Sequence, residues 1–312
     1  MFRTILVPLD GSRFAEAALP VATSFAASAR GRLHLLLAHQ PVAAMVGMGD
    51  VVMASAGLDE ELREKELTYL SEVSGGLGPL GGAAVGFSVV LGEAGPLVVE
   101  EAERLGSDLI VMATHGRGTI GRLWLGSVAD YVARHSTTPV LLVRPAPPGS
   151  LGPNRLPHRV LVALDLSPES EQVVPAVVAL AHLAQAHVTL LHVVEPFYYA
   201  GDPGLPFPIP QDATITELRC KDAQRRLDRT ADRLRERGVA VSAKVLVGTS
   251  AAAGILDLLD GPSFDMVALT THGAGGLRRL LLGSVADKVI RGASRPVLVL
   301  RPRAVAAVAA AG

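Results

Sequence analysis

The chain carries an internal repeat over nearly its whole length, and this repeat limits the possible folds more than any other feature. The segment THGRGTIGRLWLGSVADYVARHSTTPVLLVRP (114–145) aligns without a gap with THGAGGLRRLLLGSVADKVIRGASRPVLVLRP (271–302). The starts of the two halves also align, TILVPLDGS (4–12) with RVLVALDLS (159–167). Self-similarity of this kind marks a structural unit that occurs more than once. We predict two copies of one domain, at 1–146 and 158–303, with a Pro- and Gly-rich linker at 147–157 and a tail at 304–312.

Within each copy, short apolar runs alternate with helical patterns. The predicted strands of the first copy are 5–9, 33–38, 85–91, 108–113 and 140–143, and its helices are 15–29, 58–73, 97–105 and 127–135. The strands of the second copy are 160–164, 188–193, 241–247, 266–270 and 297–300. Alternating strands and helices indicate a parallel sheet with right-handed crossovers. The predicted fold class is α/β, with two tandem five-stranded, Rossmann-like domains, and the 312 residues suit two domains of roughly 150 residues each.

Composition excludes several classes of protein. The formal net charge is −1, which gives no general attraction to nucleic acid or to an anionic membrane. Cys220 is the only cysteine, so one chain can form neither a disulfide framework nor a multi-cysteine zinc site. The N-terminus does not have the pattern of a signal peptide, and no apolar run approaches the roughly 18 residues of a membrane span. We expect a cytoplasmic protein without nucleic-acid or membrane partners.

The carboxyl ends of the predicted strands carry the candidate ligand contacts. In open α/β sheets, ligands bind beyond these ends, at the point where the strand order reverses. Both copies place an aspartate after the first strand, a small apolar residue at the end of the second, and glycine turns after the third and fourth. These residues are Asp10, Ala38, Gly92 and the segment 114–116 in the first copy, and Asp165, Val193, Gly248 and the segment 271–273 in the second.

A Gly-Ser pair follows in each copy, Gly126-Ser127 and Gly283-Ser284. Serine is a preferred N-cap, and an acid three residues later makes a variant of the capping box. A helix start offers free N–H groups and the positive end of the helix dipole to a phosphate, and glycine lets an anion approach closely. For either copy alone, a well-capped helix after a tight turn remains an alternative. The pairing of this cap with a glycine turn after the neighbouring strand favours phosphate binding.

The first copy also matches G-x-G-x-x-G, through Gly116, Gly118 and Gly121. A dinucleotide fingerprint follows the first strand of its unit and opens a helix directly. These glycines follow the fourth strand instead, and Gly121 aligns with Arg278 in the second copy. We therefore reject a dinucleotide site. The elements that both copies share are T-H-G and, nine residues later, G-S-V-A-D.

This shared pattern resembles the nucleotide-binding signature of the universal stress protein family, G-x2-G-x9-G-S/T, in its tandem two-domain form. It maps onto Ala113-x2-Gly116-x9-Gly126-Ser127 and onto Thr270-x2-Gly273-x9-Gly283-Ser284, and the resemblance covers nearly the whole chain. Each copy departs from the signature at its first glycine. Alanine adds only a methyl group there, whereas threonine adds a branched side chain. The second copy also has Ala163 where the first has Pro8, so the first copy is the better nucleotide site.

The resemblance implies a role for each matched residue. The aspartates would lie near the adenine and ribose, Ala38 and Val193 would line the adenine slot, and the glycines and serines of the signature would hold the phosphates. The family's ligand is commonly ATP, often with a divalent ion such as Mg²⁺ or Mn²⁺. The predicted ATP-binding residues are Pro8, Asp10, Ala38, Gly92, Ala113, His115, Gly116, Gly126, Ser127 and Val128 in the first copy, and Asp165, Val193, Gly248, Thr270, His272, Gly273, Gly283, Ser284 and Val285 in the second.

No residue is predicted to be catalytic. His115 and His272 stand between threonine and glycine with no acid nearby in sequence to orient the ring, and there is no Walker-type phosphate loop. The resemblance implies an ATP-binding protein of stress response or signalling that changes conformation or partner, with at most weak ATPase activity. The alternatives are a slow ATP-hydrolysing enzyme on the same scaffold and a nucleotide-free interaction module. We expect both sites to bind the same nucleotide, the second more weakly.

The last predicted strand of each copy, PVLLVRP and PVLVLRP, would leave an open sheet edge if it stood alone. The resemblance implies that such strands pair across a two-fold axis. We therefore predict that the two copies form an internal pseudo-dimer. A homodimer of whole chains stays open, and the sequence identifies no downstream protein partner.

Overall fold

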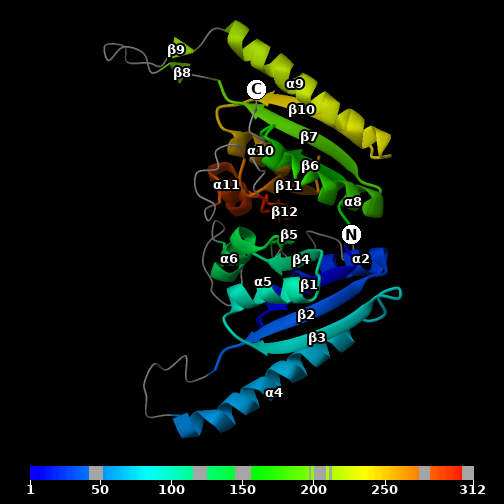
Figure 1. Ribbon diagram of the computed structural model, residues 1–312, viewed down its shortest axis with the longest axis vertical. Coiled ribbons are helices and arrows are strands. Elements are labelled where there is room, and N and C mark those ends of the chain that lie inside the picture. The colour runs from blue at the N-terminus through cyan, green and yellow to red at the C-terminus, as the bar shows by residue number, and fades with distance from the viewer. Residues whose placement is uncertain are drawn as a thin grey trace, which may run out of the picture. The chain divides into compact units, whose positions relative to one another are not determined.

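A computed structural model describes most of the chain: residues 1–41, 52–114, 125–144, 156–196, 198–199, 209–210, 213–273 and 282–303. The chain divides into two compact units, formed mainly by Met1–Leu156 and Pro157–Leu298 (Figure 1). The predicted tail at 304–312 and nearly all of the predicted linker at 147–157 lie outside the described residues.

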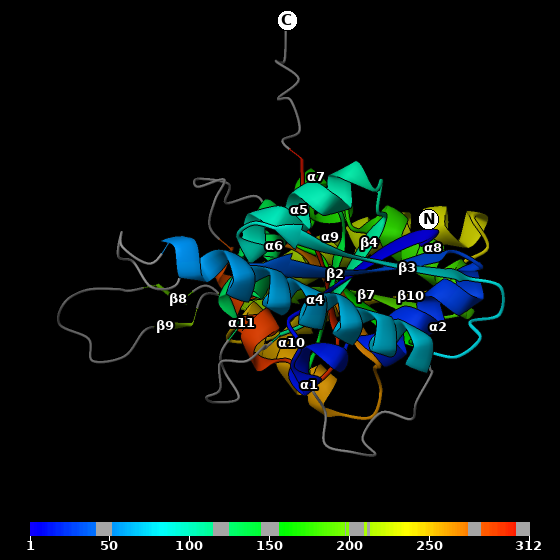
Figure 2. The same cartoon turned by 90° about the horizontal axis from the view of Figure 1, so that it is seen from below.

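The first unit is a five-stranded parallel sheet with helices on both sides. Its strands lie in the order β5-β4-β1-β2-β3. Figure 2 shows α5 and α6 above the strands and α1 below them. The strand order reverses between β1 and β4, which makes this the switch point of the sheet. Its elements are β1 (Thr4–Leu9), α1 (Arg13–Glu16), α2 (Leu19–Ala29), β2 (Arg32–His39), α4 (Val52–Gly76), β3 (Ala84–Leu91), α5 (Ala94–Arg104), β4 (Leu109–Ala113), α6 (Ser127–His135) and β5 (Val140–Val143).

The second unit repeats this plan with the strand order β10-β7-β6-β11-β12. A short antiparallel ladder of β8 with β9 lies outside its main sheet. Its elements are β6 (Arg159–Ala163), α7 (Pro168–Glu171), α8 (Val174–Ala184), β7 (His187–Val194), β8 (Tyr198–Tyr199), β9 (Ile209–Pro210), α9 (Ala213–Glu236), β10 (Val241–Val247), α10 (Ala251–Asp260), β11 (Met266–Thr270), α11 (Ser284–Gly292) and β12 (Val297–Leu300).

The central strands form the cores of the two units. Every residue of β4 and of β11 is buried. Strands covered by helices on both faces are continuously apolar rather than alternating, which is why these runs contain almost no polar residue. The predicted α/β class, with a parallel Rossmann-like sheet in each copy, is confirmed.

The helix predicted at 15–29 is wrong as a single element, because the chain forms α1 and then α2. Pro20 lies in the first turn of α2, where its missing N–H is not needed. In a continuous helix its ring would clash with the carbonyl of residue 16. Pro175 has the same position in α8, so the second unit breaks at the equivalent point.

Two other helices differ from their predicted bounds. α4 runs over Val52–Gly76 rather than 58–73. Its additional first residues, 52–57, have no apolar period, but they include the good helix formers Ala and Met. α5 begins at Ala94 rather than 97, since Pro96 is tolerated in a first helical turn. The helix predicted at 127–135 has the bounds of α6. None of the described helices has both the length and the apolar character that crossing a membrane would require.

Candidate functional site

A pocket of about 250 Å³ opens at the switch point of the first unit, beyond the carboxyl ends of β1, β2 and β4. Helices α5 and α6 supply further walls. The pocket is largely apolar, and its polar residues lie at three places: the turn after β1, the end of β4 and the start of α6. Its lining residues are Pro8, Leu9, Asp10, Ala15, Leu36, Ala38, Ala94, Val98, Met112, Ala113, Thr114, Gly126, Ser127, Val128 and Ala129.

Asp10 is held at the mouth of this pocket by a local turn. Its Oδ1 accepts hydrogen bonds from the backbone N–H of Ser12 at 2.9 Å and from the Ser12 hydroxyl at 2.6 Å. The Ser12 Oγ in turn accepts the N–H of Ala15 at 3.2 Å and caps α1. Gly11, between Asp10 and Ser12, has φ +79°, a left-handed conformation that glycine adopts without steric cost. The D-G-S sequence therefore fixes a carboxylate at the end of β1.

The second unit builds the same turn with a different middle residue. Asp165 Oδ1 accepts the backbone N–H of Ser167 at 2.9 Å and its hydroxyl at 2.5 Å. The Ser167 Oγ accepts the N–H of Ser170 at 3.1 Å and caps α7. Leu166 replaces the glycine and still adopts φ +67°. The carboxylate therefore keeps its place although the backbone at Leu166 is unfavourable for leucine.

The start of α6 lines the first pocket, and its first-turn backbone N–H groups have no acceptor within the helix. Gly126 is the N-cap, with φ −60° and ψ 150°, and its own N–H donates to the Thr114 carbonyl at 2.7 Å. The Gly126 carbonyl accepts the first helical hydrogen bond, from the N–H of Asp130 at 2.8 Å. The N–H groups of Ser127, Val128 and Ala129 precede that bond, so the helix itself provides no acceptor for them. This end of the pocket has the donors and the dipole direction that favour an anion.

The expectation that Ser127 and Ser284 are N-caps is wrong, because each is the first helical residue. The caps are Gly126 and Gly283, which share φ −60° and ψ 150°, and neither helix has a side-chain capping bond. Asp130, the acid of the expected capping box, forms an ion pair within α6 instead: its Oδ2 accepts a hydrogen bond from the Arg134 Nε at 2.7 Å. Ser127 is thus a lining residue of the first pocket and not the cap of its helix.

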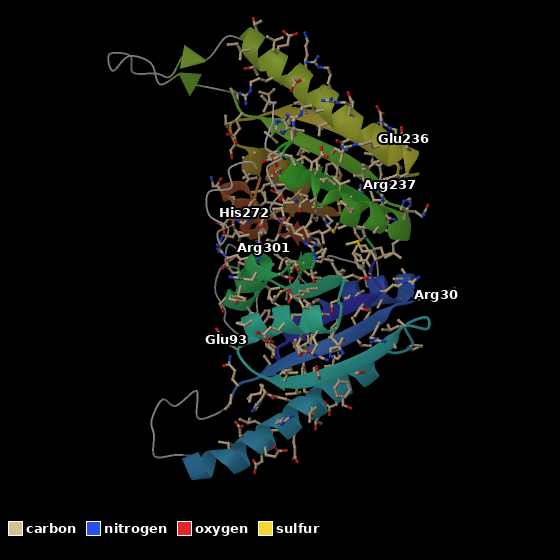
Figure 3. All side chains as sticks on the ribbon, in the orientation of Figure 1. Arg30, Glu93, Glu236, Arg237, His272 and Arg301 are labelled. Carbon is tan, nitrogen blue, oxygen red and sulfur yellow. The ribbon has the colours of Figure 1, made fainter. Side chains whose placement is uncertain are left out.

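The second unit has a pocket in the equivalent place, but its volume is about 110 Å³. Thr270 donates its hydroxyl hydrogen to the carbonyl of His272 at 2.7 Å, and the Thr271 Oγ1 lies 2.8 Å from the His272 Nδ1. Figure 3 shows His272 at the end of β11, beside α11. A Cβ at Gly273 would overlap the Asp165 carboxylate, so any other residue there would have to displace that side chain. The lining residues are Ala163, Leu164, Asp165, Ser170, Leu191, Val193, Ile255, Leu269, Thr270, Thr271, His272, Gly273, Gly283, Val285 and Ala286.

Most of the predicted site residues that the structure describes lie in these pockets. In the first unit they are Pro8, Asp10, Ala38, Ala113, Gly126, Ser127 and Val128. In the second they are Asp165, Val193, Thr270, His272, Gly273, Gly283 and Val285. Ser284 begins α11 without lining the pocket. His115 and Gly116 lie outside the described residues.

Gly92 and Gly248 close the ends of their strands rather than lining a pocket. The N–H of Gly92 donates to the His39 carbonyl at 3.1 Å, and that of Gly248 donates to the Val194 carbonyl at 3.2 Å. Gly92 adopts φ +154°, which explains its residue type without a ligand. The two hydrogen bonds also show which residues of β2 and β7 are equivalent: His39 corresponds to Val194.

Sequence reasoning missed the pocket residues contributed by α5 and α10. Ala94 and Val98 line the first pocket, and Ile255 lines the second. Their apolar side chains have the same periodic pattern as ordinary core positions, so the sequence contains no signal that separates them from the core. Only the packing of each helix over the switch point identifies them.

Neither pocket, as far as its residues are described, contains a cluster of charged metal ligands. Within the described ranges, no three His, Cys, Asp or Glu side chains gather in a way that could hold a metal ion. Among the described lining residues there is also no lysine or arginine. The groups that the described lining residues offer to an anion are therefore backbone N–H groups and hydroxyls.

Comparison with known proteins gives a consistent result. The model of the universal stress protein family matches residues 1–144 and 157–301. A universal stress protein of Thermus aquaticus is 33% identical over 145 residues, which is 46% of this chain and 100% of that protein. One of Mycobacterium tuberculosis is 29% identical over 206 residues, or 66% of this chain and 65% of the relative. The crystal structure of a universal stress protein from Archaeoglobus fulgidus has a TM-score of 0.68 at 20% identity and covers 97% of both chains.

Proposed function

The chain belongs to the universal stress protein family, which supports a role in stress response, and from this premise we propose that it binds ATP in the pocket of its first unit. Binding would act by favouring one conformation, or one protein partner, over another. A ligand shifts such an equilibrium only as far as its affinities for the two states differ. The proposed activity is therefore recognition of a nucleotide, with hydrolysis weak or absent.

One observation carries this proposal: the first pocket joins an apolar slot to an open helix start. Ala38 and Ala113 are small enough to leave room for a flat base, while Ser127 and Val128 line the same pocket with first-turn N–H groups that have no acceptor within the helix. A nucleotide has this division into a flat, weakly polar base and a highly charged phosphate chain. Asp10, held by Ser12, provides an acceptor in the same pocket for amino or hydroxyl hydrogens.

The residues present also suit the divalent ion that accompanies ATP. Mg²⁺ bound with a nucleotide keeps several waters and is held by phosphates with one or two carboxylates, so a cage of protein ligands is not required. Asp10 is the described carboxylate of the first pocket and could contact such an ion directly or through water. When bound, the ion would neutralise phosphate charge.

The first experiment is to extract purified protein and identify any adenine nucleotide by mass, followed by calorimetric titration with Mg-ATP. Gly126→Val should lower the affinity for ATP at least tenfold, because its side chain would block the phosphates while its backbone angles remain accessible to valine. Ser127→Ala should weaken binding while leaving the melting temperature nearly unchanged, since its hydroxyl does not cap α6. Glu103→Gln, exposed near the end of α5, is the matched control. Unchanged affinity in Gly126→Val would rule out this site.

A turnover assay separates the binding protein from the enzyme. Phosphate release by the purified protein with saturating Mg-ATP should stay below about 0.1 s⁻¹, which is low on the scale of enzyme turnover. A faster rate that disappears in Gly126→Val would show that the pocket hydrolyses ATP. The chain would then be an enzyme on this scaffold.

A further inference from the structure

The two pockets occupy equivalent places in their units but differ in size, about 250 Å³ in the first and about 110 Å³ in the second. Small-molecule sites are generally concave cavities of about 300 Å³ or more that enclose most of the ligand. The second pocket is therefore much further from the size of a nucleotide site. The cause can be traced to individual side chains.

Four equivalent lining positions carry a larger side chain in the second unit: one is Ser170 in place of Ala15, and the other three lie on β7, β11 and α10. Gly92 bonds to His39 and Gly248 bonds to Val194, so the residues that precede these two partners, Ala38 and Val193, are equivalent. Thr270 ends β11 where Ala113 ends β4. The third pair consists of Val98 and Ile255, which follow the starts of α5 and α10 at the same distance along the chain. All six residues line their pockets.

The larger side chains of the second unit are held in place. A Cβ built at Gly248 would lie 3.6 Å from the Cγ1 of Val193, and one built at Gly254 would lie 3.6 Å from its Cγ2, so the valine packs against both glycines. Thr270 is fixed by its hydrogen bond to the His272 carbonyl. Both are β-branched and stiff at χ1, and Ile255 is only 2% exposed. None of them can turn away to make room without disturbing its neighbours.

The backbone at the helix start beside the second pocket, in contrast, matches that of the first unit. Gly283 caps α11 with the same backbone angles as Gly126, its N–H donates to Thr271 at the same 2.7 Å, and its carbonyl accepts from Asp287 at 2.9 Å. The three larger side chains belong instead to β7, β11 and α10, and the difference that they produce between the units is in the room left for a base.

We infer that Val193, Thr270 and Ile255 exclude the adenine base from the second unit, so that one chain binds one nucleotide, in its first unit. This inference rests on the proposed function and goes beyond the modest weakening expected from the sequence. The duplicated chain then has one responsive unit and one that keeps its conformation whatever the nucleotide concentration.

Calorimetric titration of the whole chain with Mg-ATP tests the inference through the binding stoichiometry. The parent should bind one ATP per chain, and Gly126→Val should bind none. The triple variant Val193→Ala/Thr270→Ala/Ile255→Val should bind two, and adding Gly126→Val to it should leave one. The reciprocal variant Ala38→Val/Ala113→Thr should lose the site of the first unit. Melting curves and circular dichroism of each variant report whether it is folded.

Each outcome has a defined meaning. A parent chain that binds two ATP, one of them lost in Gly283→Val, would overturn the inference and leave the proposed function standing. A parent that binds no ATP would overturn the proposed function itself. A folded triple variant that still binds one ATP would show that these three side chains are not the barrier. If the triple variant does not fold, Val193→Ala and Thr270→Ala tested singly should each raise the affinity of the second site into the measurable range, and no gain in either would count against the inference.

Discussion

At the scale of single residues, Leu166 has a backbone conformation that leucine seldom adopts. Its φ of +67° reproduces the turn that Gly11 makes at φ +79° in the first unit. The left-handed region costs a residue with a side chain about 1–2 kcal/mol. The turn persists because Asp165 and Ser167 are fixed by their mutual hydrogen bonds and by the cap of α7. Tertiary demands on the carboxylate thus outweigh the local preference.

Replacing Leu166 should reveal this strain. Leu166→Gly and Leu166→Ala both remove the side chain, but only glycine relieves the backbone. We expect the glycine variant to have a free energy of unfolding higher than the alanine variant by about 1 kcal/mol, despite the greater flexibility of glycine in the unfolded chain. Urea denaturation of both variants measures the difference. Equal stabilities would mean that the turn is not strained.

His34 gives a second prediction at this scale, for the pH dependence of stability. Its Nε2 lies 2.8 Å from the Ser88 Oγ, and burial lowers the pKa of its ring below 6.5; Arg104 and Arg32 add to this effect while Glu101 opposes it. The folded state therefore takes up the proton less readily than the unfolded state. The contribution of neutral His34 is complete above the unfolded pKa and is lost as the pH falls through 6.5 towards the lower folded pKa.

The His34→Gln variant removes this titration and keeps a polar group near Ser88. Its free energy of unfolding should fall less steeply than that of the parent between about pH 7 and pH 5, the range in which histidine titrates. Urea denaturation at a series of pH values gives both slopes. Parallel curves for the parent and the variant would contradict the assignment to His34.

At the scale of secondary-structure elements, a buried histidine fastens α4 to the end of β2. His39 is 3% exposed, its Nδ1 lies 2.7 Å from the Glu66 Oε2, and its Nε2 lies 3.4 Å from the Asp59 Oδ1. Among the described residues, that Nε2 finds no hydrogen-bond partner. The equivalent residue of the second unit is Val194, 1% exposed. One unit thus uses a polar contact at a position where the other uses an apolar one.

Removing one partner of this contact should cost more than removing both. Glu66→Ala leaves the His39 ring buried without its carboxylate, and we expect a loss of about 1–3 kcal/mol in the free energy of unfolding. The double variant His39→Val/Glu66→Leu should recover most of that loss by imitating the second unit. Glu64→Ala, at an exposed position of α4, is the control and should change stability by less than about 0.5 kcal/mol. Denaturation midpoints of the three variants measure these differences in stability. A double variant that is less stable than Glu66→Ala would contradict this account.

At the scale of the whole molecule, the pairing of the two copies stays a prediction from the sequence. Their apolar last strands would be open edges if left alone, and edge strands of this kind invite pairing. The test is a panel of cysteine pairs in a Cys220→Ser background, with one cysteine within 140–143 and the other within 297–300. At least one pair should form an intramolecular disulfide under mild oxidation. A folded panel in which no pair cross-links would exclude the internal pseudo-dimer.

The features that depend on pattern could be predicted from the amino-acid sequence. The repeat established two units, and the alternation of apolar runs with helical periods established a parallel α/β sheet. The ends of those strands identified Asp10 and Ala38, and the resemblance to the family signature identified Ala113. This works because the carboxyl ends of parallel strands converge on one edge whatever the details of packing. Boundaries were less reliable: Pro20 divided a predicted helix, and the cap of α6 fell on Gly126 rather than Ser127.

Only the tertiary structure decided which apolar residues belong to the pockets and how much space they leave. Val98 and Ile255 look like core residues in the sequence, and their role depends on the packing of α5 and α10 over the switch point. Pocket volume is what remains after side chains from several elements have been packed together, so no local pattern contains it. Two copies with the same motif can therefore differ by more than a factor of two in the volume they enclose.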